Sequence, residues 1–173
     1  RILNVNNHKY MFGGRCNKYA NIRKKKTINE NEVFDYIEKR NEILFEECAP
    51  DPETFVRKKD VVVGIPRCFS FYTLWPLYSW FFYNLGVETV VSKNISGEGT
   101  ARVESSYCFP AEIAHGAVQD IFDRNPDYIF LPHFRDMESY EEETPANFCP
   151  ITQALPYYIK KAFPEIPDSK YLA

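Results

Sequence analysis

The residue with the clearest chemical potential is Cys108, which comes just before the predicted first turn of an amphipathic helix. The unpaired N–H groups and the positive dipole end of a helix start favour a thiolate over a neutral thiol. Pro110 suits an early helical position, where its missing N–H would have no partner. Such a thiolate can bind a metal or act in catalysis, whereas free cysteines often pack as small core residues, and position alone leaves both interpretations open.

Three further side chains with ligand chemistry follow predicted strands. Cys68 comes after the strand predicted at 61–65, His133 after the one at 127–131, and Cys149 lies in the next connection. Open parallel sheets bind ligands beyond the carboxyl ends of their strands, so these residues are expected at one edge. Thiolates from separate loops suit zinc or an iron–sulfur cluster. The chain lacks the C-x-x-C pairs of strong zinc patterns, so burial of Cys68 and Cys149 as apolar residues stays open.

Two other motifs give weaker evidence for a functional site. His115 stands two turns after Cys108 on the same helical face. The helical rise of about 10 Å between them is too long for direct proton transfer, so His115 is interpreted as a capping, packing or supporting residue. Gly97 and Gly99 predict a flexible loop. They lack the strand-to-helix context of a phosphate cradle, so nucleotide binding within this chain is not expected.

The order of the predicted elements gives an α/β fold, with an open parallel sheet and helices on both faces. Short apolar strands and longer helices alternate: strands at 61–65, 88–91 and 127–131, and helices at 71–85 and 110–124. The tail at 151–163 predicts one more short strand and a helix. These elements must place the candidate ligands at one edge of the sheet.

A small β-hairpin is predicted at the N-terminus, with residues 2–5 pairing with residues 9–12. An exposed amphipathic helix at 31–47 follows an irregular linker. We therefore expect two parts, namely a hairpin and linker at 1–29 and an α/β domain at 30–173. Because the chain opens within an apparent strand, we expect a fragment of a longer multidomain protein.

Composition limits the class of protein. The 173 residues carry a net charge of -3 and an aromatic share of 16%, which argue against disorder and against nucleic-acid partners. No apolar run approaches membrane-spanning length and no signal peptide is evident, so we expect a cytoplasmic protein without a membrane partner. The five cysteines are too widely spaced for a disulfide framework.

Four motifs occur in order along the chain: Phe-Gly-Gly-Arg-Cys-Asn-Lys-Tyr at 12–19, Gly-Ile-Pro-Arg at 64–67, Cys-Phe-Pro-Ala-Glu-Ile-Ala-His-Gly at 108–116 and Asn-Phe-Cys-Pro at 147–150. Together they resemble the 2-hydroxyacyl-CoA dehydratase superfamily. More closely, they are similar to a domain of unknown function (DUF2229 type) found in large CoA-substrate-specific enzyme activase proteins. The resemblance covers nearly the whole chain.

The resemblance implies a Rossmann-like fold of the dehydratase-subunit type and an iron–sulfur protein of anaerobic metabolism. Its members receive an electron from a partner that hydrolyses ATP and pass it at low potential to a substrate such as a 2-hydroxyacyl-CoA. It implies Cys108 and Cys149 as ligands of a 4Fe-4S type cluster. Cys16 corresponds to a linker cysteine whose site would need a cysteine pair upstream of Arg1. The implied partners are ATP-binding ATPase domains of the same polypeptide and a second dehydratase-like domain.

Two positions depart from the family pattern. Cys68 stands where an apolar residue is expected after Pro-Arg, and His133 where relatives often carry a cysteine. Cys68 or His133 would complete the cluster, and ligation by His133 in place of a thiolate would raise its reduction potential. Alternatively, the departures mark a member that has lost its cluster. We therefore expect a domain of an ATP-coupled iron–sulfur activator or reductase in low-potential electron transfer, inactive as an isolated fragment. The alternatives are a non-catalytic interaction module and a structural zinc domain.

Overall fold

The computed structural model describes residues 2–6, 8–11, 34–104, 108–139 and 146–173. The chain divides into two compact units, Arg1–Glu38 and Lys39–Ala173, and each is described by itself. None of the helices within the described ranges has the length and apolar character needed to span a membrane.

The first unit contains the predicted hairpin. Strand β1 (Ile2–Val5) pairs antiparallel with β2 (His8–Met11), and Val5 lies opposite His8. Asn6 has a φ of 49°, a left-handed conformation that asparagine tolerates in tight turns. The hairpin is confirmed, with its second strand beginning one residue earlier than expected. The predicted linker lies outside the described residues.

The second unit is built on a parallel sheet with the strand order β4-β3-β5-β6. Its strands are β3 (Val62–Ile65), β4 (Glu88–Val91), β5 (Tyr128–Phe130) and β6 (Tyr171–Leu172). The first three strands match the prediction, and they pair in parallel because each is followed by a helical crossover. The predicted α/β architecture is confirmed.

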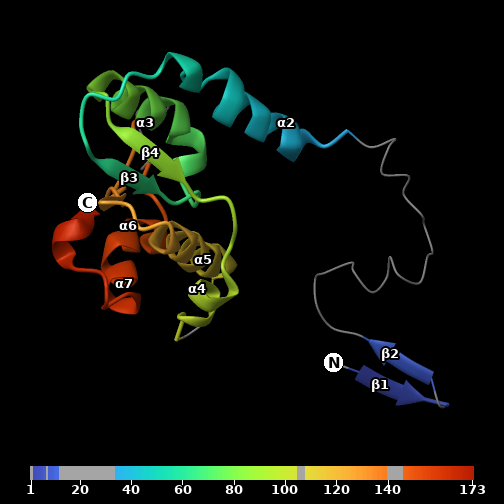
Figure 1. Ribbon diagram of the computed structural model, residues 1–173. Coiled ribbons are helices and arrows are strands. Elements are labelled where there is room, and N and C mark those ends of the chain that lie inside the picture. Colours follow the sequence, from blue (N-terminus) through green and yellow to red (C-terminus); the bar gives the residue numbers. More distant parts are fainter. Residues whose placement is uncertain (1, 7, 12–33, 105–107, 140–145) are drawn as a thin grey trace. The chain divides into compact units, whose positions relative to one another are not determined.

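Helices cover both faces of this sheet (Figure 1). Helix α3 (Phe71–Leu85) packs with the π-helical turn η2 (Ile43–Glu47) on one face, and α5 (Phe109–Asp123) lies on the other with α7 (Leu155–Ala162). Helix α3 ends where predicted because Gly86 adopts a φ of 69° and its N–H donates to carbonyl oxygens of the last turn.

The helix expected at 31–47 is seen as α2 (Tyr36–Glu42), which continues directly into η2. Two short 3₁₀ turns, η3 (Pro52–Thr54) and η4 (Asp168–Lys170), complete the unit.

Two predictions about local structure were wrong. The loop expected around Gly97 and Gly99 is the short helix α4 (Gly97–Ala101), capped by the Ser96 hydroxyl, which accepts from the Gly99 N–H at 3.4 Å. The tail forms α6 (Pro150–Gln153) and α7, whereas the strand β6 comes only after Pro167. The tail is helical because Leu155, Ile159 and Phe163 recur every fourth residue and bury one face.

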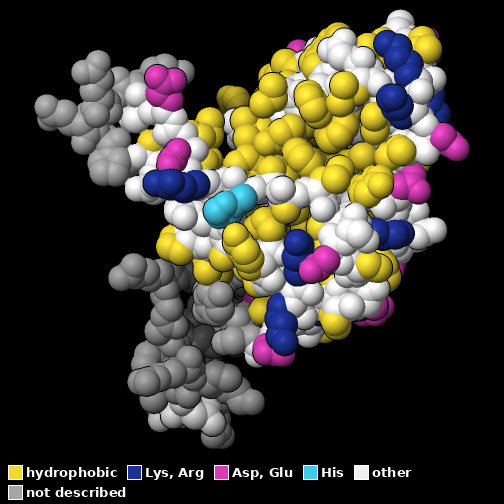
Figure 2. All heavy atoms as spheres, turned by 90° about the vertical axis from the view of Figure 1, so that its left-hand side faces the viewer, with side chains coloured by type: hydrophobic (Ala, Val, Ile, Leu, Met, Phe, Trp, Pro, Cys, Tyr) yellow, Lys and Arg dark blue, Asp and Glu magenta, His cyan; other side chains and the backbone are white. Residues whose placement is uncertain are grey.

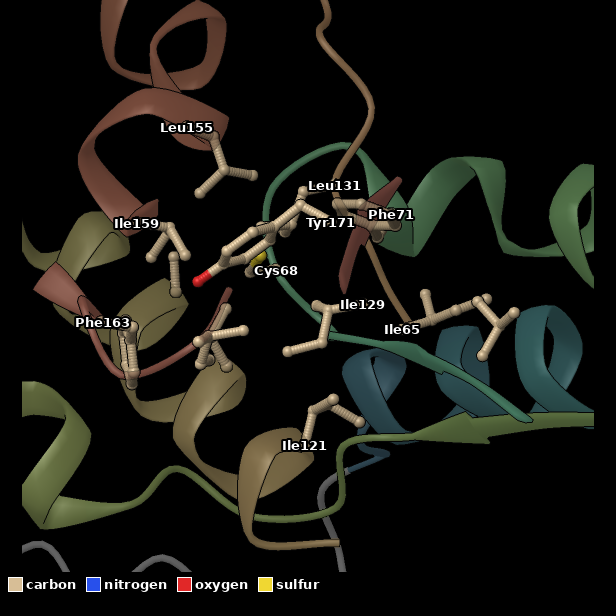
Figure 3. Close-up of a cluster of buried hydrophobic side chains, with 14 of the residues drawn as sticks. Ile65, Cys68, Phe71, Ile121, Ile129, Leu131, Leu155, Ile159, Phe163 and Tyr171 are labelled. Carbon is tan, nitrogen blue, oxygen red and sulfur yellow. The ribbon is translucent and has the colours of Figure 1, made fainter. Parts of the chain in front are cut away.

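The core of the second unit lies between the sheet and α5, α7 and α3. Figure 3 shows the side chains of Leu131 from the sheet region and of Leu155 and Ile159 from α7 on one side of the cluster, with Ile129 near its centre and Ile65 on the other side. These side chains are at most 2% exposed. Burial of each stabilises the fold by roughly 1.5–3 kcal/mol, so the scaffold at the carboxyl edge of the sheet is fixed by packing.

Candidate functional site

Cys108 is the residue before α5, as predicted, and its backbone is extended with a φ of -143°. Its carbonyl oxygen accepts hydrogen bonds from the N–H groups of Ala111 at 2.9 Å and Glu112 at 3.3 Å, and its thiol makes no capping bond. Cys108 is partly buried. A thiol held at the start of a 15-residue helix, with no partner in the cap, remains available to a ligand.

A cavity of about 470 Å³ opens beside Cys108. It lies where the end of α4, the start of α5 and α7 approach one another. Its described lining residues are Arg102, Val103, Glu104, Cys108, Ala111, His115, Ala154, Tyr157, Tyr158, Lys161 and Ala162. This volume is within the range of pockets that hold small molecules or cofactors.

Two cationic side chains line this cavity. Arg102 is fixed by an ion pair with Glu165 at 2.7 Å and by a hydrogen bond to the carbonyl oxygen of Ala162 at 3.1 Å. Its guanidinium lies 4.4 Å from the centroid of the Phe163 ring. Lys161, on α7, is exposed. The described lining of the cavity therefore carries two cationic side chains and the carboxylate of Glu104.

His115 also lines this cavity, and the residue is only 5% exposed. Its Nδ1 lies 2.7 Å from the carbonyl oxygen of Ala111, which only accepts, so Nδ1 carries the proton and Nε2 is left as an acceptor. The ring stacks on Tyr158 with centroids 5.3 Å apart. Burial lowers the pKa of His115, and the hydrogen bond to Ala111 opposes this only in part. The imidazole is therefore neutral at neutral pH.

The shared cavity of Cys108 and His115 was missed from the sequence. The distance between Cys108 and His115 along the helix is too long for direct proton transfer between their side chains. It still allows both side chains to line one cavity. Side chains on a helix tilt toward its N-terminus. This direction was the signal that could have placed His115 on the same wall as Cys108.

Burial of His115 makes the stability of the second unit depend on pH. Because its pKa in the folded chain lies below the ordinary 6.5, the unfolded chain takes up more protons as the pH falls below 6.5. We expect the free energy of unfolding to decrease between pH 6.5 and the lower folded pKa, and to be fully retained above pH 6.5. Urea unfolding at about pH 8 and about pH 5 tests this, and the decrease should shrink in His115→Gln. An equal decrease in the variant would contradict this assignment.

The other predicted ligands are placed differently. Cys68 is 1% exposed and packs in the core among the apolar side chains of Figure 3. Burial raises the pKa of its thiol far above the usual range, so it remains protonated. Cys149 is exposed at the start of α6 and makes no capping bond. His133 is exposed, with its ring edge-on to Tyr157 at 5.8 Å. Cys16 lies outside the described residues.

The described residues alone do not assemble a metal site. Among them, no three histidine, cysteine, aspartate or glutamate side chains gather in a way that could hold a metal ion. The described lining of the Cys108 cavity contains His115 but neither Cys149 nor His133. The ligand set of Cys108, Cys149, Cys68, His133 and Cys16 therefore stays a prediction, and Cys68 suits it least because its thiol is buried and neutral.

Comparison with known proteins gives one match. The family model described as CoA enzyme activase uncharacterised domain (DUF2229) matches residues 62–173, which span the strands of the parallel sheet and the Cys108 cavity. No curated protein and no solved structure matches the chain.

Proposed function

This chain belongs to the family of the CoA enzyme activase uncharacterised domain, and we propose that its Cys108 and Cys149 are thiolate ligands of an iron–sulfur cluster in a larger protein. Such a cluster would supply low-potential electron transfer. The family is described as an uncharacterised domain of CoA enzyme activases, and this description supports the proposal. The role of the cluster, its coupling to ATP on other domains and the 2-hydroxyacyl-CoA dehydratase relationship are parts of this proposal.

The observation that carries the proposal is the position of Cys108 beside the cavity at the start of α5. Cys108 is partly buried, lines the cavity and makes no side-chain capping bond at the helix start. Arg102 and Lys161 line the same cavity and would offset the negative charge that thiolates bring to a cluster. Cys149 is exposed at the start of α6 and likewise makes no side-chain capping bond.

The donor set fits a cluster only in part. Cys108 and Cys149 have the accessibility that a ligand needs, whereas the buried Cys68 does not. Four ligands are usual for a cubane cluster, so the remaining ligands would come from residues such as Cys16 or from a second dehydratase-like domain. Within this chain, Arg102 and Lys161 are the cationic residues of the described lining, and Tyr158 and His115 stack against each other in the same lining.

The expected result for Cys108→Ser is a loss of most of the bound iron. The substitution removes a soft ligand and leaves a hydroxyl that binds iron poorly. The measurement is the iron and sulfide content of the anaerobically purified, full-length parent protein, together with its thiolate-to-iron absorption in the visible range. Cys48→Ser is the matched control, since Cys48 is an exposed thiol outside the cavity and should leave the iron content unchanged. Equal iron in Cys108→Ser and the wild type would reject Cys108 as a ligand.

A second candidate function is an interaction module without a cluster. Helix α3 favours it, because Leu77, Trp80, Phe81 and Leu85 on its outer face are 46–62% exposed. Figure 2 shows a broad hydrophobic area at the top of the molecule, where α3 lies in Figure 1. Such areas commonly mark interaction surfaces. The interaction-module function is supported if the wild-type parent protein holds no iron and if replacement of both Cys108 and Cys149 leaves partner binding intact. Zinc without iron would instead support a structural zinc domain.

A further inference from the structure

Arg67 occupies the place in the sheet where ligands of open α/β folds commonly bind. It follows β3, and the chain passes from β3 to β4 on one side and then returns to β5 on the other side of β3. Such a reversal of strand order opens a crevice at the carboxyl ends of the two strands. The Arg67 backbone N–H donates to the Ser92 hydroxyl at 2.8 Å, which ties this loop to the end of β4.

The guanidinium of Arg67 is held by aromatic rings and not by acids. Its central carbon lies 3.9 Å from the centroid of Phe45 and 5.4 Å from that of Tyr72. Its Nε is buried without a hydrogen-bond partner among the described residues. Ring faces offset part of the cost of removing a cation from water, but they do not accept the in-plane N–H bonds of the guanidinium.

Arg40 brings a second cation to the same ring. Its central carbon lies 5.4 Å from the centroid of Tyr72, and its hydrogen bond to Asn41 is a weak one at 3.4 Å. Two cations around one side chain repel each other unless an anion lies between or beside them. Among the residues that the structure describes, no carboxylate forms an ion pair with Arg40 or Arg67.

The other arginines within the described ranges show that this pattern is specific to the Tyr72 region. Each of them forms an ion pair with a carboxylate: Arg57, Arg102, Arg124 and Arg135. Arg67 and Arg40 are the described arginines for which no ion pair is found, and they share one ring. The other arginines in the described part of the chain are neutralised by carboxylates, so the exception points to a ligand that supplies the missing charge.

The start of α3 lies beside these arginines. Tyr72 is in the first turn of this 15-residue helix. The N–H groups of Phe71 and Tyr72 already donate to the carbonyl oxygens of Cys68 and Phe69, so this helix start contributes its dipole to the attraction of an anion. The two guanidinium groups together offer more donors than a single carboxylate can accept.

We propose that Arg67 and Arg40, at the start of α3, bind the phosphate groups of a phosphorylated small molecule. Arginine matches phosphate oxygens with paired N–H donors, and the doubly or triply negative charge of a diphosphate balances two arginines and a helix start. This site uses residues other than those lining the Cys108 cavity, and the inference does not depend on a cluster.

Titration calorimetry of the full chain with inorganic pyrophosphate tests the proposal. Arg67→Gln should weaken binding by at least about tenfold, and Arg67→Lys should weaken it less because the charge stays and the paired donors are lost. Arg40→Gln should weaken binding by at least about threefold. Arg124→Gln removes a charge at the far end of α5 and should leave the affinity unchanged. Absence of pyrophosphate binding by the wild type, or equal binding by Arg67→Gln, would overturn the proposal.

Two further measurements test the same site independently. If Arg67→Gln fails to fold, the exposed Arg40 still tests the shared site, because unchanged pyrophosphate affinity in Arg40→Gln would reject it. Malonate, a dicarboxylate, should bind at least about tenfold more weakly than pyrophosphate. Equal affinity for malonate would show a carboxylate site and overturn the assignment to phosphate.

Discussion

Replacement of Phe163 by alanine should lower the free energy of unfolding of the second unit by about 3–5 kcal/mol. Phe163 is fully buried directly after α7, and Figure 3 shows it in the apolar cluster. Its ring lies under the Arg102 guanidinium and stacks on His115 with centroids 6.3 Å apart. Truncation therefore leaves a void in the core and also removes the ring that supports one wall of the Cys108 cavity.

Urea unfolding followed by circular dichroism measures this effect. Phe81→Ala is the matched control, since Phe81 is 53% exposed on α3 and its loss should cost less than about 1 kcal/mol. A similar effect for both phenylalanines would mean that Phe163 is not the central packing residue described here.

The second large effect is expected for Gly99→Ala, which should destabilise the second unit by about 1–3 kcal/mol. A methyl group at Gly99 would lie 2.5 Å from the carbonyl oxygen of His115 and 2.8 Å from the Cα of Gly116. These are backbone atoms of α5, so they cannot turn aside as the end of a flexible side chain would. The close approach of α4 to α5 therefore requires glycine at this position.

Gly97→Ala is the control within the same helix. A methyl group at Gly97 would have nothing within 4 Å, and alanine is the better helix former. The free energy of unfolding should stay unchanged or rise by at most about 1 kcal/mol. Thermal or urea unfolding of both variants gives the comparison. Equal stability of the two variants would contradict the α4–α5 contact.

Much of the fold was predictable because its signals are local. The β-branched run before Gly64 and the left-handed Gly86 after an apolar helix determine where β3 and α3 lie, and both were predicted within one residue. Strand β6 was missed because two residues carry no periodic pattern and pair only once β5 offers an edge. Helix α4 was missed because the contact of Gly99 with α5 is tertiary.

Of the residues in the candidate site, only Cys108 was placed correctly from the sequence. A cysteine one residue before a helix carries a local signal, and Cys108 lies where that signal puts it. The approach of Arg102 and Lys161 to the same cavity depends on how α4 and α7 pack against α5, for which the local sequence has no signal. Cys68 shows the opposite case. It follows a strand as predicted, but it fills an apolar position of the core, in keeping with the apolar residue expected there from the family pattern.

The central claim is that Cys108 binds an iron–sulfur cluster, and electron paramagnetic resonance of the reduced, full-length parent tests it most directly. We expect the signal of a reduced cluster in the wild type and in Cys48→Ser. In Cys108→Ser the signal should be lost or have altered g values, because the ligand field of one iron changes. A wild-type signal that persists unaltered in Cys108→Ser, or the absence of any cluster signal in a reconstituted wild-type parent, would contradict the claim.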